Sequence, residues 1–277
     1  MQTVQHMLRT GQRGAPHAFG MAFQDLRNSG LRIGLAWSLA WHDIVSRYRG
    51  SLLGPFWITL SMGLMVLGIS VLYSNLFSIP LNEFMPFVAL GIVFFGLISQ
   101  TVLEGCQTFV QASGMLSQTA LPILTFVWRT VFRNLITLAH HLVIVAAVLI
   151  WYGAWRKADV PLAVFGVVLV ALNISWLSLL VGIFSARFRD IPQVVASVMQ
   201  FAMFMTPVFW QPTERLIGHA VLHANPFYHM LQVVRGPLLG DPDVTLSFIV
   251  MTVMAVVGWA VSFTIFTFTR RRIVHYL

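Results

Sequence analysis

Six long apolar runs, separated by short polar stretches, make up most of this chain of 277 residues. Only 9% of the residues are charged and 57% are hydrophobic, whereas a soluble domain carries about 25% charged residues. A helix that crosses a bilayer needs about 20 apolar residues. The runs therefore predict an all-α membrane protein, a single transmembrane domain over residues 1–277, with six transmembrane helices at about 53–77, 85–104, 127–151, 161–186, 194–210 and 244–269.

The basic residues determine the orientation of these spans. With the N-terminus in the cytoplasm, the outer segments hold four of the 17 Lys and Arg residues: Arg156, Lys157, Arg215 and Arg235. Because Lys and Arg are enriched in cytoplasmic loops, this bias predicts that both termini are cytoplasmic. The cations flank apolar runs and form no basic face, so the net charge of +8 indicates membrane lipid as a partner, and no nucleic acid.

The chain before the first span divides into a tail and a short helix. The first 20 residues lack the apolar core of a signal peptide, and residues 1–34 are expected to form a loose cytoplasmic tail. Residues 35–50 place Trp37, Trp41 and Ile44 on one side of an N-terminal amphipathic interfacial helix, a pattern typical of helices in the headgroup layer. Asp43 and Arg47 are expected to pair on it. A helix packed on a soluble domain is the alternative.

The segment between the fifth and sixth spans is too apolar for an ordinary loop. Residues 211–243 hold two apolar pieces, "ERLIGHAVLH" and "PFYHMLQVVRGPLL", each too short to cross a bilayer. Asn225-Pro226 predicts a sharp turn between them. We therefore expect a re-entrant outer helical hairpin, with a simple extracellular loop as the alternative.

The sequence lacks the motifs of several enzyme classes. A phosphate-binding P-loop needs a lysine after a glycine-rich turn, but Lys157 is the only lysine and follows no such turn. The chain is therefore expected to bind no cofactor and no ATP. Cys106 is the only cysteine and no His-Glu-x-x-His is present, so we expect no metal site and no catalytic residue.

Aromatic residues in the spans are candidates for a substrate path. Their flat faces stack on sugar rings and pack on apolar chains, while lipid-facing packing is the alternative explanation for each of them. The candidates are Phe56, Trp57, Tyr73, Phe94, Phe204, Trp210 and Tyr228.

Four stretches resemble the permease subunits of type-2 ABC exporters, in the branch that exports O-antigen, capsule and teichoic-acid polysaccharides. They are "DIVSRYRGSLLGPFW" (43–57), "RFRDIPQVVASVMQFAMFMTPVFW" (187–210), "NPFYHMLQVVRGPLLG" (225–240) and "RRRIVHYL" (270–277). The resemblance implies a homodimer in a bacterial inner membrane that binds two copies of an ABC ATPase subunit, which would bind ATP and Mg²⁺. It also implies that the chain moves a lipid-linked polysaccharide.

The resemblance also assigns roles to two groups of residues. The ATPase would contact the segment 107–123 and the turn at 187–190, through Gln118, Leu121, Pro122, Arg187, Arg189 and Asp190. Arg47, Tyr48 and Arg49 would receive the pyrophosphate of the lipid anchor, because guanidinium groups bind phosphate well. Anchoring of these arginines to anionic membrane lipid is the competing explanation.

Other functions stay open at this point. A type-2 exporter of a drug or another lipid has the same topology. A polytopic membrane glycan or lipid transferase would use His140 or His219 and need no ATPase. The role of the His140-His141 pair is not explained by the resemblance, and an assembly factor without transport activity is a further alternative.

Overall fold

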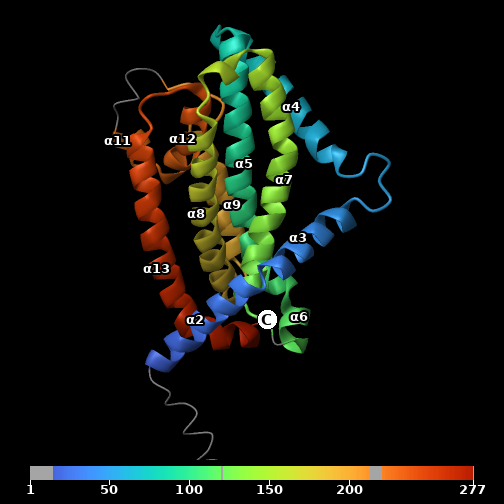
Figure 1. Cartoon of the computed structure of the whole chain (residues 1–277), viewed down its shortest axis with the longest axis vertical. Helices are drawn as coiled ribbons and strands as arrows, with labels where there is room; N and C mark the ends of the chain where they lie inside the picture. The colour runs from blue at the N-terminus through green and yellow to red at the C-terminus, as the bar shows by residue number, and fades with distance from the viewer. Residues whose placement is uncertain (1–14, 120, 213–219, 277) are drawn as a thin grey trace, which may run out of the picture.

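The computed structural model describes residues 15–119, 121–212 and 220–276, and every element in these ranges is helical. Figure 1 shows the bundle that they form. The elements are α2 (Ala15–Leu31), α3 (Ile33–Arg47), α4 (Phe56–Phe77), α5 (Leu81–Gln111), α6 (Ser113–Gln118), α7 (Leu124–Trp151), η1 (Ala154–Lys157), α8 (Val160–Arg187), α9 (Ile191–Met205), α11 (Ala220–His223), α12 (Pro226–Leu239) and α13 (Thr245–Tyr276).

Five of the six predicted spans are helices long and apolar enough to cross a membrane, within the ranges that the structure describes. They are α4, α5, α7, α8 and α13. The segment predicted at 194–210 forms the 15-residue helix α9 instead, which ends before Pro207. At 1.5 Å per residue α9 is about 22 Å long, short of the roughly 30 Å of a bilayer core. A sixth span therefore stays a prediction.

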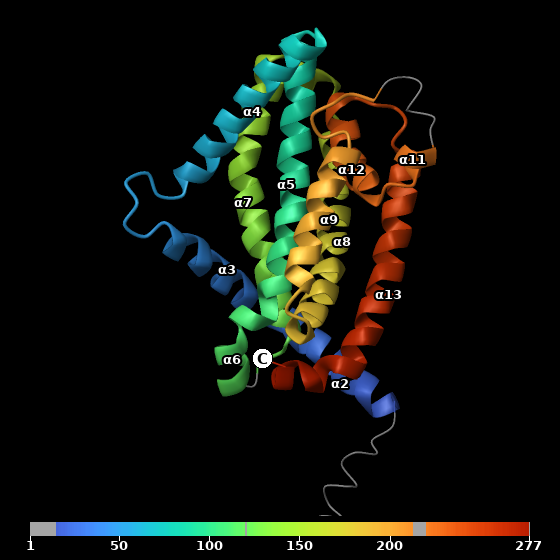
Figure 2. The same cartoon turned by 180° about the vertical axis from the view of Figure 1, so that it is seen from behind.

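Helix α5 forms the centre of the bundle. In its most apolar stretch 78% of the residues are buried, against 22% in α4 and in α13. Figures 1 and 2 show α4 and α13 on opposite sides of the bundle, with α4 leaning away at its N-terminal end. Both outer helices expose apolar side chains such as Leu67 and Val256, as expected of surfaces that face lipid or another subunit.

Helix α12 lies in the interior at the end of the bundle opposite α2 (Figure 2). Asn225 caps its first turn by accepting a hydrogen bond from the Phe227 backbone N–H at 2.9 Å, and Pro226 occupies the first helical position. Gly166 of α8 lets α12 approach closely, because an added Cβ would clash with the Val233 carbonyl oxygen. Of the first limb of the predicted hairpin the structure describes only α11 and the residues up to Asn225, because residues 213–219 lie outside the described residues.

The predicted loose tail is wrong for residues 15–31, which form α2. Helix α2 crosses one end of the bundle beside the C-terminal part of α13 (Figure 1). Its Asp25 carboxylate is fully buried and forms a salt bridge with Arg270 of α13 at 2.9 Å. We call this end of the bundle the α2 end. Residues 1–14 lie outside the described residues.

Candidate functional site

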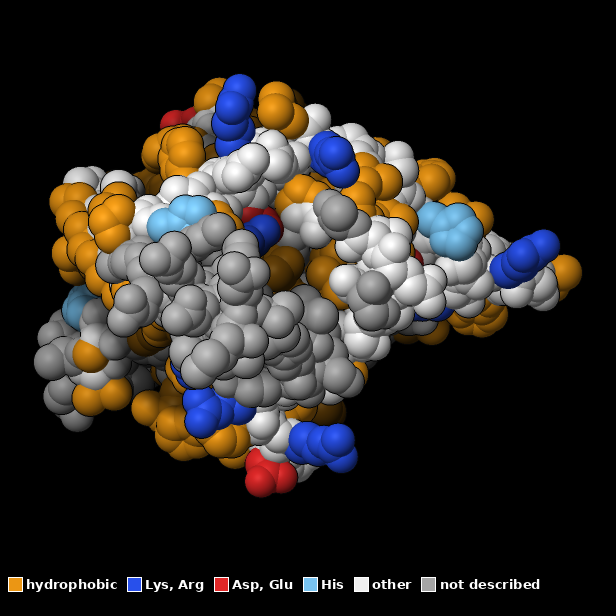
Figure 3. Space-filling model, turned by 90° about the horizontal axis from the view of Figure 1, so that it is seen from below, with side chains coloured by type: hydrophobic (Ala, Val, Ile, Leu, Met, Phe, Trp, Pro, Cys, Tyr) orange, Lys and Arg blue, Asp and Glu red, His pale blue; other side chains and the backbone are white. Residues whose placement is uncertain are grey.

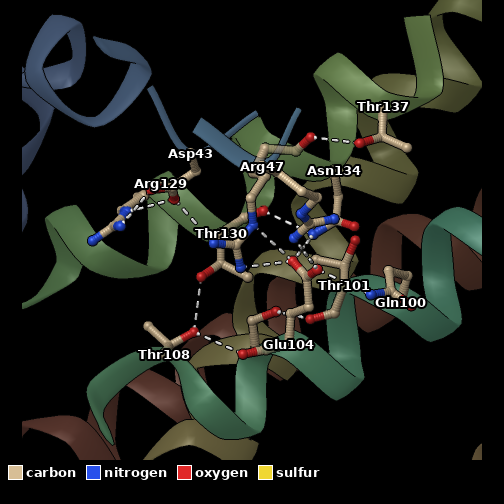
Figure 4. A network of polar contacts seen from close by, with 12 residues as sticks. Asp43, Arg47, Gln100, Thr101, Glu104, Thr108, Arg129, Thr130, Asn134 and Thr137 are labelled. Carbon is tan, nitrogen blue, oxygen red and sulfur yellow. Dashed lines mark hydrogen bonds and ion pairs between the residues drawn. The ribbon is translucent and has the colours of Figure 1, made fainter. Parts of the chain in front are cut away.

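A network of charged side chains joins α3, α5 and α7 (Figure 4). Arg129 donates two hydrogen bonds to the Asp43 carboxylate, at 2.6 and 2.8 Å. Arg133 donates to Asp43 at 3.0 Å and twice to Glu104, at 2.7 and 2.9 Å. Arg47 stands at the edge of the network, with its guanidinium 3.8 Å from Glu104. These contacts fix the end of α3 against the two helices that carry its counter-ions.

This arrangement corrects two predictions. Asp43 pairs with arginines of α7 and not with Arg47. The predicted span 85–104 places Glu104 at a helix end, yet Glu104 lies inside α5 and binds Arg133 of α7. Burial raises the pKa of Asp43, but hydrogen bonds and charges from Arg129 and Arg133 outweigh it and lower this pKa below its usual value. The Asp43 carboxylate is therefore ionised at neutral pH.

Beside this network a cleft opens between α4, α5 and α7. It consists of two adjoining cavities of about 270 and 500 Å³, which share Arg47, Met62, Thr137 and His141 as lining residues. We call it the α4 cleft. Helix α4 contributes the apolar side chains Trp57, Ile58, Met62 and Met65, and most of the polar lining comes from α5 and α7. An amphipathic cleft of this kind matches a ligand with a polar head and an apolar tail.

The structure brings three of the predicted headgroup and aromatic residues together in this cleft. Arg47, Tyr48 and Trp57 all line its larger cavity. Arg49 and Phe56 are exposed beside it and line neither part. The turn that connects them contains Gly50 and Gly54, which have positive φ angles of 83° and 55°. Residues with a Cβ rarely adopt this conformation, so the glycines shape the turn after Arg49.

The other predicted aromatic residues do not form one continuous path within a single chain. Tyr73 and Phe204 both contact the ring of Phe209, with centroids 5.8 and 6.0 Å away, and Trp210 donates to the Phe204 carbonyl oxygen at 3.1 Å. Phe94 is 1% exposed and belongs to the hydrophobic core, lining neither part of the cleft. Tyr228 contacts the rings of His223 and His229 in the α12 region. Of these aromatic candidates, only Trp57 therefore lines the α4 cleft together with Arg47.

The two segments predicted to contact an ATPase meet around a third cavity, of about 250 Å³. Gln107 near the end of α5 and Ser113 in α6 face it from one segment, and Arg189 faces it from the other, beside Pro192 of α9. Much of 107–123 is helical, in the end of α5 and in α6, although this segment lies between two predicted spans. Gln118 is exposed at the end of α6, Leu121 is half-buried and Pro122 is buried. The Arg187 guanidinium lies 5.0 Å from the centre of the Phe188 ring, and Asp190 directly precedes α9.

Comparison with known proteins settles what kind of chain has this geometry. A model of the ABC-2 type transporters matches residues 34–239, which is most of the chain and includes every helix from α4 to α12. The chain belongs to the ABC-2 type transporter family. An O-antigen export system permease protein, RfbA of Myxococcus xanthus, is 26% identical to this ABC-2 permease over 182 residues, covering 64% of this chain and 68% of that protein.

Membership of the ABC-2 family identifies the chain as a transport subunit and implies an ABC ATPase partner. Seen from the α2 end, basic side chains are spread over the visible face and acidic ones show at few places (Figure 3). The segments that meet around the third cavity lie at the end where α6 is found (Figure 2). They are thus the part of the ABC-2 permease to test for contact with the ATPase.

Two histidines of the ABC-2 permease, His140 and His229, hold structural hydrogen bonds. His140 binds the Ile136 carbonyl oxygen at 2.9 Å, and His229 binds Ser247 and the His223 carbonyl oxygen at 2.9 and 2.8 Å. His141 lines both parts of the α4 cleft. No cluster of three or more metal-ligating residues occurs among residues 15–119, 121–212 and 220–276, and His219 lies outside these ranges.

Sequence reasoning missed Asp25, which ties three helices together at the α2 end. Its carboxylate accepts hydrogen bonds from the backbone N–H groups of Ile123 and Leu124, both at 3.2 Å, and so caps α7. It also accepts from Arg270 at 3.0 Å. Its partners lie 98 to 245 residues away in sequence, so no local pattern could have revealed this role.

Replacing Asp25 with alanine is expected to lower the free energy of unfolding by about 2 kcal/mol, because the α7 cap and the ion pair are both lost. Thermal unfolding of the purified permease in detergent measures this loss, and limited proteolysis shows whether α2 separates from the bundle. Asp25→Asn is the matched variant: its amide oxygen retains a cap acceptor, so it should lose less. Equal stability of Asp25→Ala and the wild type would contradict the cap.

Proposed function

We propose that this ABC-2 permease is the transmembrane subunit of an ATP-driven exporter that moves lipid-linked polysaccharide of the O-antigen kind across a bacterial inner membrane. The observation that carries the proposal is the similarity to an O-antigen export permease over 182 residues. In this proposal two copies of the chain form a homodimer, both termini face the cytoplasm, and two copies of an ABC ATPase bind ATP and Mg²⁺ and attach at the α2 end.

The α4 cleft gives the proposal a physical mechanism for substrate recognition. Arg47 has a half-exposed side chain, and among the described residues its one counter-ion is the distant Glu104, at 3.8 Å. A guanidinium in this situation binds the oxygens of a diphosphate strongly, because charge-assisted hydrogen bonds gain from partial exclusion of water. Tyr48 and Trp57 stand beside it. The lipid-linked substrate would thus meet a cation and aromatic side chains where α3 meets α4.

Deletion of the gene in its own bacterium tests the function. We expect polysaccharide to disappear from the cell surface and to accumulate inside on its lipid carrier, with full restoration by a plasmid copy. Purification of the tagged permease from the same cells should bring a stoichiometric ATPase with it, and ATP hydrolysis should be absent from the permease alone.

Two results would reject the proposal in different ways. Unchanged surface polysaccharide together with a bound ATPase would favour export of a drug or another lipid. Transferase activity of the purified chain without any partner would favour the membrane enzyme.

A further inference from the structure

The smaller cavity of the α4 cleft is lined by hydrogen-bonding side chains for which transport of a lipid alone gives no reason. Apart from the shared Arg47 and the paired Glu104, its polar lining is uncharged: Ser99, Gln100, Asn134, Thr137 and His141. Amide, hydroxyl and imidazole groups match sugar hydroxyls, which both donate and accept hydrogen bonds. A tail of pure hydrocarbon would leave unpaired every donor and acceptor here that has no partner within the protein.

Glu104 orients two of these side chains. Gln100 donates its amide N–H to Glu104 at 2.9 Å, and Asn134 donates to Glu104 at 2.8 Å and to the Thr130 carbonyl oxygen at 3.0 Å. The amide oxygens of Gln100 and Asn134 accept no hydrogen bond from the part of the chain that the structure describes. The two ring nitrogens of His141 form no hydrogen bond with that part of the chain either. These atoms are available to a ligand that carries hydroxyl groups.

The order of chemical groups along the cleft matches the order of groups in a lipid-linked sugar. The larger cavity, of about 500 Å³, has an apolar wall from α4 that suits a hydrocarbon chain. Arg47 lines both cavities and therefore lies where they adjoin. The smaller cavity, of about 270 Å³, has the uncharged polar lining. A lipid, a diphosphate and a sugar follow one another in the same order.

We propose that the smaller cavity binds the first sugar of the substrate, while Arg47 binds the diphosphate and the lipid chain lies along α4. This inference rests on the proposed function and adds to it: a single subunit recognises the sugar next to the anchor. Glu104 is a positioning residue in this site, because it holds the Gln100 and Asn134 amides with their oxygens free.

Binding of three lipids to the full-length permease in nanodiscs tests the proposal without the ATPase. The probes are a polyprenyl diphosphate that carries one hexose, the same lipid without the sugar, and phosphatidylglycerol. We expect the sugar-bearing lipid to bind about tenfold more tightly than the sugarless one, as two or so additional neutral hydrogen bonds allow. The double variant Gln100→Met/Thr137→Val should remove this preference, because it weakens binding of the sugar-bearing lipid far more than binding of the sugarless lipid.

Thr252→Val of α13 is the matched control. Like Thr137, Thr252 bonds the carbonyl oxygen four residues before it, with its hydroxyl at 2.8 Å from Phe248, but it lies outside the cleft. This control should keep the full preference. Equal binding of the two diphosphate lipids by the wild type would overturn the sugar site, as would parallel loss of both lipids in the double variant. Tighter binding of phosphatidylglycerol than of either would assign the cleft to bulk lipid.

These outcomes are separate from those of the proposed function. The deletion experiment reads polysaccharide on intact cells and does not depend on how the sugar is held. Loss of surface polysaccharide on deletion, combined with no sugar preference in nanodiscs, would reject the sugar site alone. Unchanged surface polysaccharide would reject the proposed function whatever the cleft binds.

Discussion

Replacing Arg133 with leucine is expected to lower the free energy of unfolding by about 3–5 kcal/mol, the usual effect of removing one partner of a buried ion pair. The Arg133 side chain is 9% exposed and is the closest counter-ion of Glu104. Without it, Glu104 keeps amide hydrogen bonds and the distant Arg47 but little compensation for its buried charge. Asp43 is less affected, because it retains Arg129.

Thermal unfolding of the purified protein in detergent checks this expectation, with the yield of folded protein as a second measure. The double variant Glu104→Leu/Arg133→Leu should be more stable than Arg133→Leu, because it leaves no unpaired carboxylate on α5. Arg156→Leu, at an exposed arginine in η1, is the matched control and should change stability little. If the single and double variants lose the same stability, the loss comes from packing and the ion-pair explanation is wrong.

The existence of the long helices could be predicted because the signal is local. An apolar run of sufficient length is a property of one segment, and five of the six runs are helices of the required length. The ends were less predictable: α5 continues to Gln111, seven residues beyond the predicted span, because the end of an apolar run does not end a helix. Helix α9 is shorter than its apolar run, since the chain leaves the helix before Pro207.

The charged network could not be predicted, because its partners are far apart in sequence. The spacing of Asp43 and Arg47 satisfied a local rule for helical ion pairs, yet Asp43 binds arginines 86 and 90 residues away. Such an i,i+4 pair is worth only about 0.2–0.5 kcal/mol, so partly buried hydrogen-bonded arginines outcompete it. The same reasoning explains why α2 was mistaken for a loose tail: Asp25 has its partners on α7 and α13.

The charged and aromatic residues at the entrance of the candidate site could be predicted from the sequence, but the residues that line its interior could not. The sequence placed Arg47, Tyr48 and Trp57 in one short stretch, and all three line the α4 cleft. Which face of α5 and α7 turns toward α4 depends on helix rotation, so Gln100 and Thr137 gave no signal, and the His140-His141 pair stood out without a role. Rotation also explains Phe94, an aromatic candidate that turns into the core.

The double variant Arg47→Gln/Arg49→Gln is expected to reduce polysaccharide export at least tenfold while the protein still inserts and folds. Hydrogen bonds from a guanidinium to a charged group contribute about 1.5–3 kcal/mol each, or roughly 10- to 100-fold in binding. Stability should change little, since the Arg47 side chain is 52% exposed and its ion pair is long. Surface polysaccharide on complemented deletion cells measures export, and membrane content of the tagged chain measures insertion.

Single variants distinguish binding of the diphosphate from anchoring to anionic lipid. Arg47→Gln alone should account for most of the loss, because Arg47 lines the α4 cleft and Arg49 does not. Arg47→Lys keeps the charge but loses the planar fork that binds two phosphate oxygens at once. If Arg47 only anchors α3 to the membrane, lysine should restore export completely, since anchoring depends on charge alone. Partial export with lysine supports the diphosphate, and unchanged export in the double variant would remove both arginines from the transport mechanism.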